Sequence, residues 1–138
     1  MRPPTRPPAD PPPGRRDGGR RALGADGEAR AAAWLEARGW RLLGRNVRAG
    51  GVEIDLVAAR GRTVAFVEVK TRRGRGAGAP EEAVDARKRE RLVRGAAAWL
   101  AEHGRGAWRA RFDVICVEPE GDGAWRVRHL EAAFDATD

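Results

Sequence analysis

The sequence predicts an α/β domain in which a mixed β-sheet is flanked by helices. Residues 24–38 and 80–103 have the composition and apolar spacing of helices. Five short segments between and after them are rich in β-branched and aliphatic residues, as strands are. Their order along the chain is α-β-β-β-α-β-β, which is typical of a single sheet with helices on its faces.

The first 21 residues are expected to form a disordered tail in front of a domain at 22–138. The tail holds seven of the nine prolines and no large apolar residue other than Met1, so it cannot bury enough surface to offset the entropy of ordering it. Six arginines and two aspartates give it a charge of +4, out of +7 for the whole chain. A basic arm on a mildly basic domain suits nucleic acid as a partner, and a simple solvated linker is the alternative.

The first half of the domain is expected to form a helix and three strands. Residues 24–38 are alanine-rich, and Gly39 follows as a stop signal for the helix. A short strand is expected at 40–43. The segments 52–58 and 63–71 read as a hairpin, because Arg60-Gly61 between them is a tight-turn signal.

The second half is expected to form a helix and two strands. A glycine-rich basic loop at 72–79 leads to Pro80, which suits the first position of a helix that reaches about His103. Strands are expected at 111–118 and 125–130, with a turn between them. Arg111 and Asp113, on either side of Phe112, are expected to form a structural pair.

The hairpin carries the residues with chemical potential. Alternation in the strands predicts Ile54 and Leu56 on one face of the sheet, with Asp55 on the other. Glu68 and Lys70 share the face of Asp55 in either of two registers. One register pairs Asp55 with Phe66, and the other pairs Asp55 directly with Glu68.

Clustered carboxylates repel one another unless a cation lies between them, and hard oxygen ligands select Mg²⁺ or Mn²⁺. Lys70 would point into the same site, where its ammonium could orient a water or offset charge on a phosphate. Of the 27 basic residues only Lys70 and Lys88 are lysine. In so biased a chain, a lysine at this position indicates a need for a compact amine. A solvated hairpin face is the alternative, although Val64 and Phe66 beside Glu68 indicate partial burial.

Five blocks of the sequence resemble the YraN-like family of uncharacterised bacterial proteins. They are LGADGEARAAAWLEARGWRLLGRN, EIDLVA, VAFVEVKTR, AVDARKRERLVRGAAAWL and RFDVICV. That family is similar in fold to the restriction-endonuclease-like superfamily, with its PD-(D/E)xK site, and to archaeal Holliday junction resolvases. The resemblance implies catalytic and metal-binding roles for Asp55, Glu68 and Glu28, and a catalytic role for Lys70. It implies hydrolysis of phosphodiester bonds in DNA, with branched or single-stranded DNA as candidate substrates.

Basic residues around this site are candidates for binding nucleic acid, namely Arg72, Arg73, Arg75 and Lys88. Ordinary salt bridges along the second helix are the alternative for Lys88. Two rival functions stay open, a nucleic-acid-binding module of the same fold that does not cut and a protein-interaction scaffold. Relatives of this fold include dimers, and a homodimer would suit a substrate with two strands.

The sequence has no apolar run long enough to cross a membrane and no signal-peptide pattern at its N-terminus. Its single cysteine, Cys116, lies in an apolar run and has no partner for an internal disulfide. These features favour the cytoplasm.

Overall fold

The computed structural model describes residues 18–72, 85–104 and 106–134, and only the backbone of residues 18–25. Two helices and five strands follow the expected order: α1 (Gly18–Ala37), β1 (Arg41–Ala49), β2 (Val52–Arg60), β3 (Thr63–Thr71), α2 (Ala86–Glu102), β4 (Arg109–Pro119) and β5 (Trp125–Phe134). The predicted α/β class, with a mixed sheet and flanking helices, is confirmed.

The five strands form one sheet in the order in which they occur along the chain. Only the β3–β4 pair is parallel, and α2 lies in the connection between these two strands. A parallel pair needs such a crossover because the chain must return to the end of the sheet at which β3 begins before β4 can run in the same direction. The end of β3 and the start of α2 therefore belong to one β-α-β unit, and the candidate site lies there.

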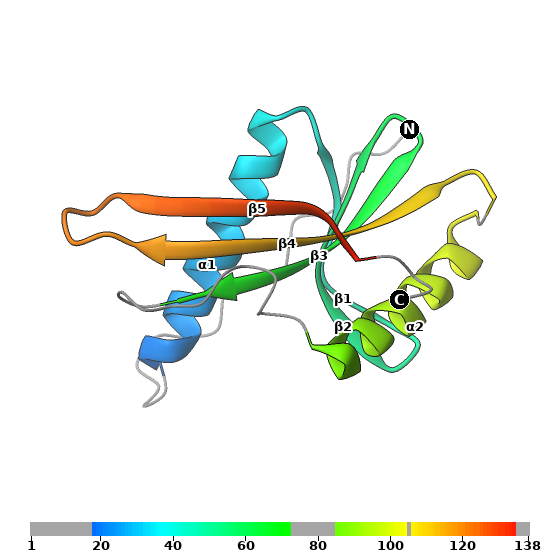
Figure 1. Ribbon diagram of the computed structural model, residues 1–138, viewed down its shortest axis with the longest axis horizontal. Helices are drawn as coiled ribbons and strands as arrows, with labels where there is room; N and C mark the ends of the chain where they lie inside the picture. Colours follow the sequence, from blue (N-terminus) through cyan, green and yellow to red (C-terminus); the bar gives the residue numbers. More distant parts are fainter. Residues whose placement is uncertain (1–17, 73–84, 105, 135–138) are drawn as a thin grey trace.

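Each face of the sheet is covered by one helix, with a core beneath it (Figure 1). The core under α1 includes Leu35, Trp40 and Ile115, whereas the core under α2 includes Phe66, Trp99 and Phe112. Within the α2 core, Phe66 packs edge-on against Trp99, with 5.7 Å between ring centroids. Two cores on opposite faces explain why β3 and β4, the central strands, are apolar on both sides.

The helix boundaries differ from those expected. The α1 backbone begins at Gly18, so it includes residues 18–21 of the predicted tail; residues 1–17 lie outside the described part of the chain. The α2 helix begins at Ala86, where the Asp85 side chain accepts a hydrogen bond from the Lys88 backbone N–H at 3.0 Å. This aspartate is the N-cap, because its oxygen satisfies a free amide of the first turn. Pro80, the expected start, also lies outside the described residues.

The first strand is longer than expected, because β1 continues to Ala49 through a bulge between Leu42 and Gly44. Such a bulge bends a strand and increases its twist. Asn46 adopts a positive φ of 49°, a conformation that asparagine tolerates better than most residues. The bend brings the hairpin between β1 and β2 alongside α2, where Gly50 lies next to the Arg94 carbonyl.

The predicted faces of β2 are only partly confirmed. Leu56 packs in the α1 core and Val57 in the α2 core, as alternation requires. Ile54, expected beside Leu56, packs in the α2 core instead. The strand stops pairing with β3 after Leu56 and twists toward α2, which rotates its earlier side chains out of the predicted phase.

Candidate functional site

The predicted acidic residues meet where β2 and β3 separate. The backbone pairing of these strands runs from Arg60–Thr63 to Leu56–Val67, which is the second of the two predicted registers. Extending that register by one residue on each strand brings Asp55 opposite Glu68. The hairpin sequence alone thus placed these two carboxylates on neighbouring strands, with Lys70 two residues further along β3.

Asp55 is fixed to the backbone of β3 by its own side chain. Its Oδ2 accepts a hydrogen bond from the Val69 N–H at 2.8 Å, just beyond the last backbone pair of the two strands. The carboxylate therefore occupies a place that a strand carbonyl would otherwise take. This bond restricts the rotamer of Asp55 and holds its carboxylate beside that of Glu68.

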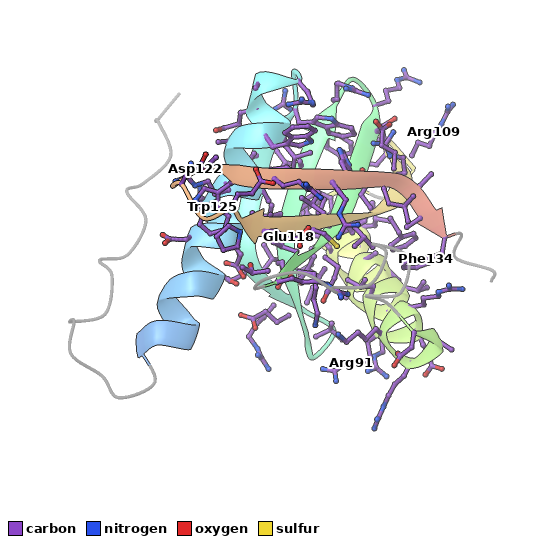
Figure 2. The ribbon with its side chains drawn as sticks, turned by 60° about the vertical axis from the view of Figure 1, so that its left-hand side comes forward. Arg91, Arg109, Glu118, Asp122, Trp125 and Phe134 are labelled. Atoms are coloured by element: carbon purple, nitrogen blue, oxygen red, sulfur yellow. The ribbon has the colours of Figure 1, made fainter. Side chains whose placement is uncertain are left out.

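A cavity of about 260 Å³ adjoins these carboxylates, between the sheet and α2. Its walls come from both elements and are mostly charged: Val52, Glu53, Asp55, Glu68, Lys88, Arg91 and Leu92. Arg91 projects from α2 at the lower edge of the molecule in Figure 2. The cavity thus has acidic groups on its sheet side and basic groups on its helix side, a combination suited to a cation and a phosphate together.

Burial makes the negative charges of this site costly. The pKa of Glu68 is raised to about 7, chiefly by burial and then by the neighbouring negative charge of Asp55. The pKa of Asp55 is also raised, chiefly by burial, although the Val69 hydrogen bond opposes the shift. Carboxyl groups held near one another with raised pKa values bind a proton or a metal cation more readily than isolated ones.

Two lysines face these carboxylates. Burial lowers the pKa of the Lys70 amine, and the neighbouring charge of Lys88 lowers it further. The Lys88 Nζ lies 3.9 Å from Glu68 Oε2, at the outer limit of an ion pair. Lys88 was predicted to bind nucleic acid, and the structure places it in the wall of the acidic site.

Glu28 joins this group from the other helix. The helix α1 begins ten residues before Glu28, so Glu28 lies within the helix. Burial raises the pKa of Glu28, followed by the negative charge of Asp55, and a hydrogen bond with the Asn46 side chain opposes the shift. Glu28 is therefore close enough to Asp55 for their charges to interact. Only the family resemblance had indicated it.

Gly27 allows α1 to approach β3 next to Glu28. A Cβ at this position would collide with the Thr71 side chain, contacting its Oγ1 and Cβ. The absence of a side chain at Gly27 therefore permits a close contact that a larger residue would prevent.

We expect Gly27→Ala to lower the free energy of unfolding by about 1–3 kcal/mol, because overpacking forces either α1 or Thr71 to move. Urea unfolding measures this, with Ala29→Ser on the exposed face of α1 as the control. The double variant Gly27→Ala/Thr71→Ser would still meet Oγ1, whereas Gly27→Ala/Thr71→Ala removes it and should recover part of the loss. No recovery in the alanine pair would show that the contact with Thr71 is not the cause.

The remaining predicted residues have different outcomes. Arg72 is half-buried at the end of β3, and its backbone N–H donates to the Val117 carbonyl at 2.9 Å. Its charge also lowers the pKa of the Cys116 thiol, which burial raises. Arg73, Arg75 and the glycine-rich loop fall outside the described residues.

A second polar cluster is structural, as the Arg111–Asp113 spacing had suggested. Asp113 is fully buried and accepts two hydrogen bonds of 2.9 Å from the Arg111 guanidinium. It also contacts His129 Nε2 at 2.7 Å and the Ala132 N–H at 3.0 Å, and the Trp34 indole N–H donates to His129 Nδ1. Sequence reasoning missed His129 and Trp34 here, because 95 positions separate them.

The donor chemistry of Asp55 and Glu68 fits a hard divalent cation. In the described part of the chain, no three acidic, histidine or cysteine side chains are arranged to hold a metal ion. Mg²⁺ needs only one or two carboxylates, because water and substrate phosphate complete its octahedron. Asp55 and Glu68 can supply these two, and Glu28 would act at longer range through charge. No helix within the described ranges is long and apolar enough to span a membrane.

Comparison with known proteins agrees with the resemblance that the sequence motifs indicated. The chain is 49% identical over 117 residues to a UPF0102 protein of Anaeromyxobacter dehalogenans, covering 85% of this chain and 87% of that protein. It is 50% identical over 116 residues to a UPF0102 protein of Symbiobacterium thermophilum, covering 84% and 98%. A UPF0102 protein of Nocardia farcinica is 47% identical over 120 residues, covering 86% and 94%.

The region shared with this family contains the whole candidate site. Residues 27–117 match the sequence profile of the family, and they include Glu28, Asp55, Glu68, Lys70 and Lys88. The chain therefore belongs to the Uncharacterised protein family UPF0102, the YraN-like family.

Proposed function

We propose that this protein is a metal-dependent nuclease that hydrolyses phosphodiester bonds in DNA. One observation carries the proposal. Asp55 is hydrogen-bonded to β3 beside Glu68, both carboxyl groups have raised pKa values, and they line a cavity whose other wall carries Lys88 and Arg91. This arrangement suits a divalent cation on the sheet side and a phosphate on the helix side.

The roles follow from the positions of the side chains. Asp55 and Glu68 would hold Mg²⁺ or Mn²⁺, and Glu28 would add negative charge behind them. The cation, when bound, supplies Lewis-acid activation of a water and of the phosphate. Lys70, two residues beyond Glu68 on β3, would hydrogen-bond the attacking water through its Nζ and offset charge that develops on the phosphate.

The charge of the chain supports a nucleic acid as substrate. The sequence has a net charge of +7, and the helix wall of the cavity is basic. Lysine and arginine side chains bind the phosphate backbone without regard to sequence. We infer that the protein acts in the cytoplasm. Branched or single-stranded DNA are the first candidate substrates. A homodimer would present two such sites to the two strands of a duplex.

The test is cleavage of linear duplex, single-stranded and four-way-junction DNA in the presence of Mn²⁺. Wild type is expected to cut at least one of these, and Asp55→Ala and Lys70→Ala are expected to lower the rate at least about a hundredfold, as the loss of one preorganised charged group does. Asp122→Ala is the control, because Asp122 lies in the β4–β5 turn, far from Arg91 in Figure 2. Equal rates for wild type and both site variants would contradict the proposal.

A nucleic-acid-binding module that does not cut is the second candidate. It is favoured by the contact between Lys88 and Glu68, which already gives one carboxylate a cationic neighbour. This candidate predicts salt-sensitive DNA binding that persists in Asp55→Ala, with no cleavage of any substrate. A protein-interaction scaffold predicts no salt-dependent binding of nucleic acid at all.

A further inference from the structure

One end of the sheet carries a group of exposed arginines that the proposed reaction does not use. It is the end at which β2 turns into β3 and at which β1 and β4 begin. The C-terminal end of α1 lies beside the β2–β3 hairpin there, in the upper part of Figure 1. We call this surface the arginine end, and its residues are Arg38, Arg41, Arg60, Arg62 and Arg109.

Strand pairing brings these arginines together from separate parts of the chain. The register places Arg60 of β2 and Arg109 of β4 on either side of Thr63 of β3. Arg41 begins β1 and lies opposite Ala59 on β2. The sheet therefore delivers positive charge from four of its strands and their connections to one end.

Two of these guanidinium groups are held over tryptophan rings. The Arg38 guanidinium carbon lies 3.1 Å from the centre of the Trp34 ring, and that of Arg60 lies 4.4 Å from the centre of the Trp40 ring. Trp40 is buried, and Trp34 is fixed by its hydrogen bond to His129. An arginine held on a fixed aromatic ring loses less conformational freedom when its N–H groups bind an anion.

The positive charges of the arginine end are not offset by carboxylates. Within residues 26–72, 85–104 and 106–134, none of its five arginines forms an ion pair, whereas Arg111, Arg126 and Arg128 each pair with an acidic side chain. Exposed carboxylates are near in the sequence, at Glu36 and Glu102, but neither pairs with these arginines. A group of uncompensated like charges on a surface attracts a polyanion.

The arginine end is remote from the acidic site. Asp55 and Arg60 are five residues apart on β2, which corresponds to about 17 Å at a rise of about 3.3 Å per residue. Figure 2 shows Arg109 in the upper part of the molecule and Arg91, which lines the cavity, in the lower part. Along a DNA duplex this distance is about five base pairs. A ligand that reaches both surfaces must therefore be an extended polyanion.

We propose that the arginine end is a second binding surface for the phosphate backbone of a nucleic acid, separate from the acidic site. The inference rests on the proposed function for its choice of polyanion. It extends that function, because it predicts a contact about five base pairs away from the position of cleavage. Contacts of this kind orient a nucleic acid on the protein without reading its sequence.

The test removes two arginines from this surface and measures the salt dependence of DNA binding. Arg62→Gln/Arg109→Gln is the test pair, because these residues are joined through their backbones, the Arg109 N–H donating to the Arg62 carbonyl at 2.8 Å. Arg30→Gln/Arg126→Gln is the control pair. It removes the same charge at the other end of the sheet, where Arg30 lies over Trp125. The probe is a duplex of about 24 base pairs, long enough to cover both surfaces. Ca²⁺ replaces Mn²⁺ to prevent cleavage.

The logarithm of the association constant falls linearly with the logarithm of the salt concentration, by about 0.9 for each phosphate contact on a duplex. The test pair should therefore reduce this slope by about two and weaken binding at least about tenfold in 0.1 M salt. The control pair should change the slope by less than about half a unit. Arg62→Lys/Arg109→Lys should restore binding, since a phosphate contact needs the charge rather than the fork of a guanidinium. Urea unfolding checks that each variant keeps its fold.

The outcomes separate this surface from the proposed function. If the test pair flattens the slope as expected but no DNA is cut, the arginine end stands and the nuclease proposal fails. If the test and control pairs bind alike, the arginine end is wrong, and cleavage that depends on Asp55 would leave the nuclease proposal standing. If the lysine pair binds no better than the glutamine pair, the arginines do not act through their charge and the inference is wrong. If wild type binds no DNA, both proposals are wrong.

Discussion

Replacing Asp113 with asparagine is expected to lower the free energy of unfolding by about 3–5 kcal/mol, as breaking a buried charge pair does. The carboxylate is fully buried, and each of its oxygens accepts two donors. An amide has only one acceptor oxygen, so its NH₂ group would face donors from Arg111 or His129. The Arg111 charge would also lose its buried partner.

Urea unfolding of the two proteins measures this effect. Glu131→Gln is the matched control, because Glu131 also contacts Arg111, at 3.4 Å, but its side chain is 59% exposed. An exposed ion pair of this kind contributes about 0–1 kcal/mol. If Asp113→Asn costs no more than the control, the network does not hold β4 and β5 together.

The same network has a pH dependence of known sign. Burial alone would raise the pKa of Asp113, but the hydrogen bonds from His129 and Arg111 outweigh it and the pKa is lowered. A carboxyl whose folded pKa is depressed stabilises the fold above its unfolded pKa, about 3.9. That contribution is lost as the pH falls through the folded value. Asp113→Asn should therefore differ least from wild type in strong acid.

Glu68→Gln is expected to have the opposite effect on stability. The pKa of Glu68 in the fold is about 7, against an ordinary value of 4.5. A carboxyl whose pKa is raised in the fold contributes its full stability below its unfolded pKa, where it is protonated in both states. That contribution is lost as the pH rises through the folded value of about 7, because the buried group must then ionise. At pH 8 the ionised side chain costs about 2–3 kcal/mol, which the neutral amide avoids.

Chemical denaturation with a chelator present measures this at two pH values. At pH 8 Glu68→Gln should exceed wild type by about 2–3 kcal/mol, and at pH 5 by less than about 1 kcal/mol. Glu36→Gln, on the exposed side of α1, should show no such trend. Added Mg²⁺ or Mn²⁺ should stabilise wild type and not Glu68→Gln, since a ligand that binds only the fold stabilises it. A variant less stable than wild type at both pH values would show that the fold favours the ionised carboxylate.

These two predictions concern opposite uses of a buried carboxylate. Asp113 is fully provided with donors, and its charge holds two strands together. Glu68 lies beside Asp55 with the Lys88 Nζ 3.9 Å away, and burial makes its negative charge unfavourable. Natural proteins retain such unfavourable charges where binding or catalysis needs them.

Local patterning predicted much of the candidate site. Asp55, Glu68 and Lys70 lie on two strands joined by a tight turn, and a period of two residues is enough to place them on one face. The same rule failed at Ile54, because β2 twists once it leaves β3. Alternation does not describe the change of twist where β2 keeps β1 as a neighbour but leaves β3.

Contacts between distant segments were beyond sequence reasoning. The place of Arg91 in the cavity depends on how α2 crosses the sheet, which no local pattern specifies. The contact of Asn46 with Glu28 joins β1 to α1 and depends on a positive φ that no pattern specifies. The hydrogen bond between Trp34 and His129 likewise forms only when α1 packs on the sheet beside β5.

The gathering of both lysines at one site also makes the protein unusual as a chemical target. Reagents that acylate amines leave the guanidinium groups of arginine unmodified, so Lys70 and Lys88 are the two side chains that such a reagent can reach. A general labelling reaction is thereby limited to these two side chains and the α-amine of the chain. Mass measurement of the peptides that contain Lys70 and Lys88 would then report their modification, and a ligand that covers these lysines would appear as protection from acylation.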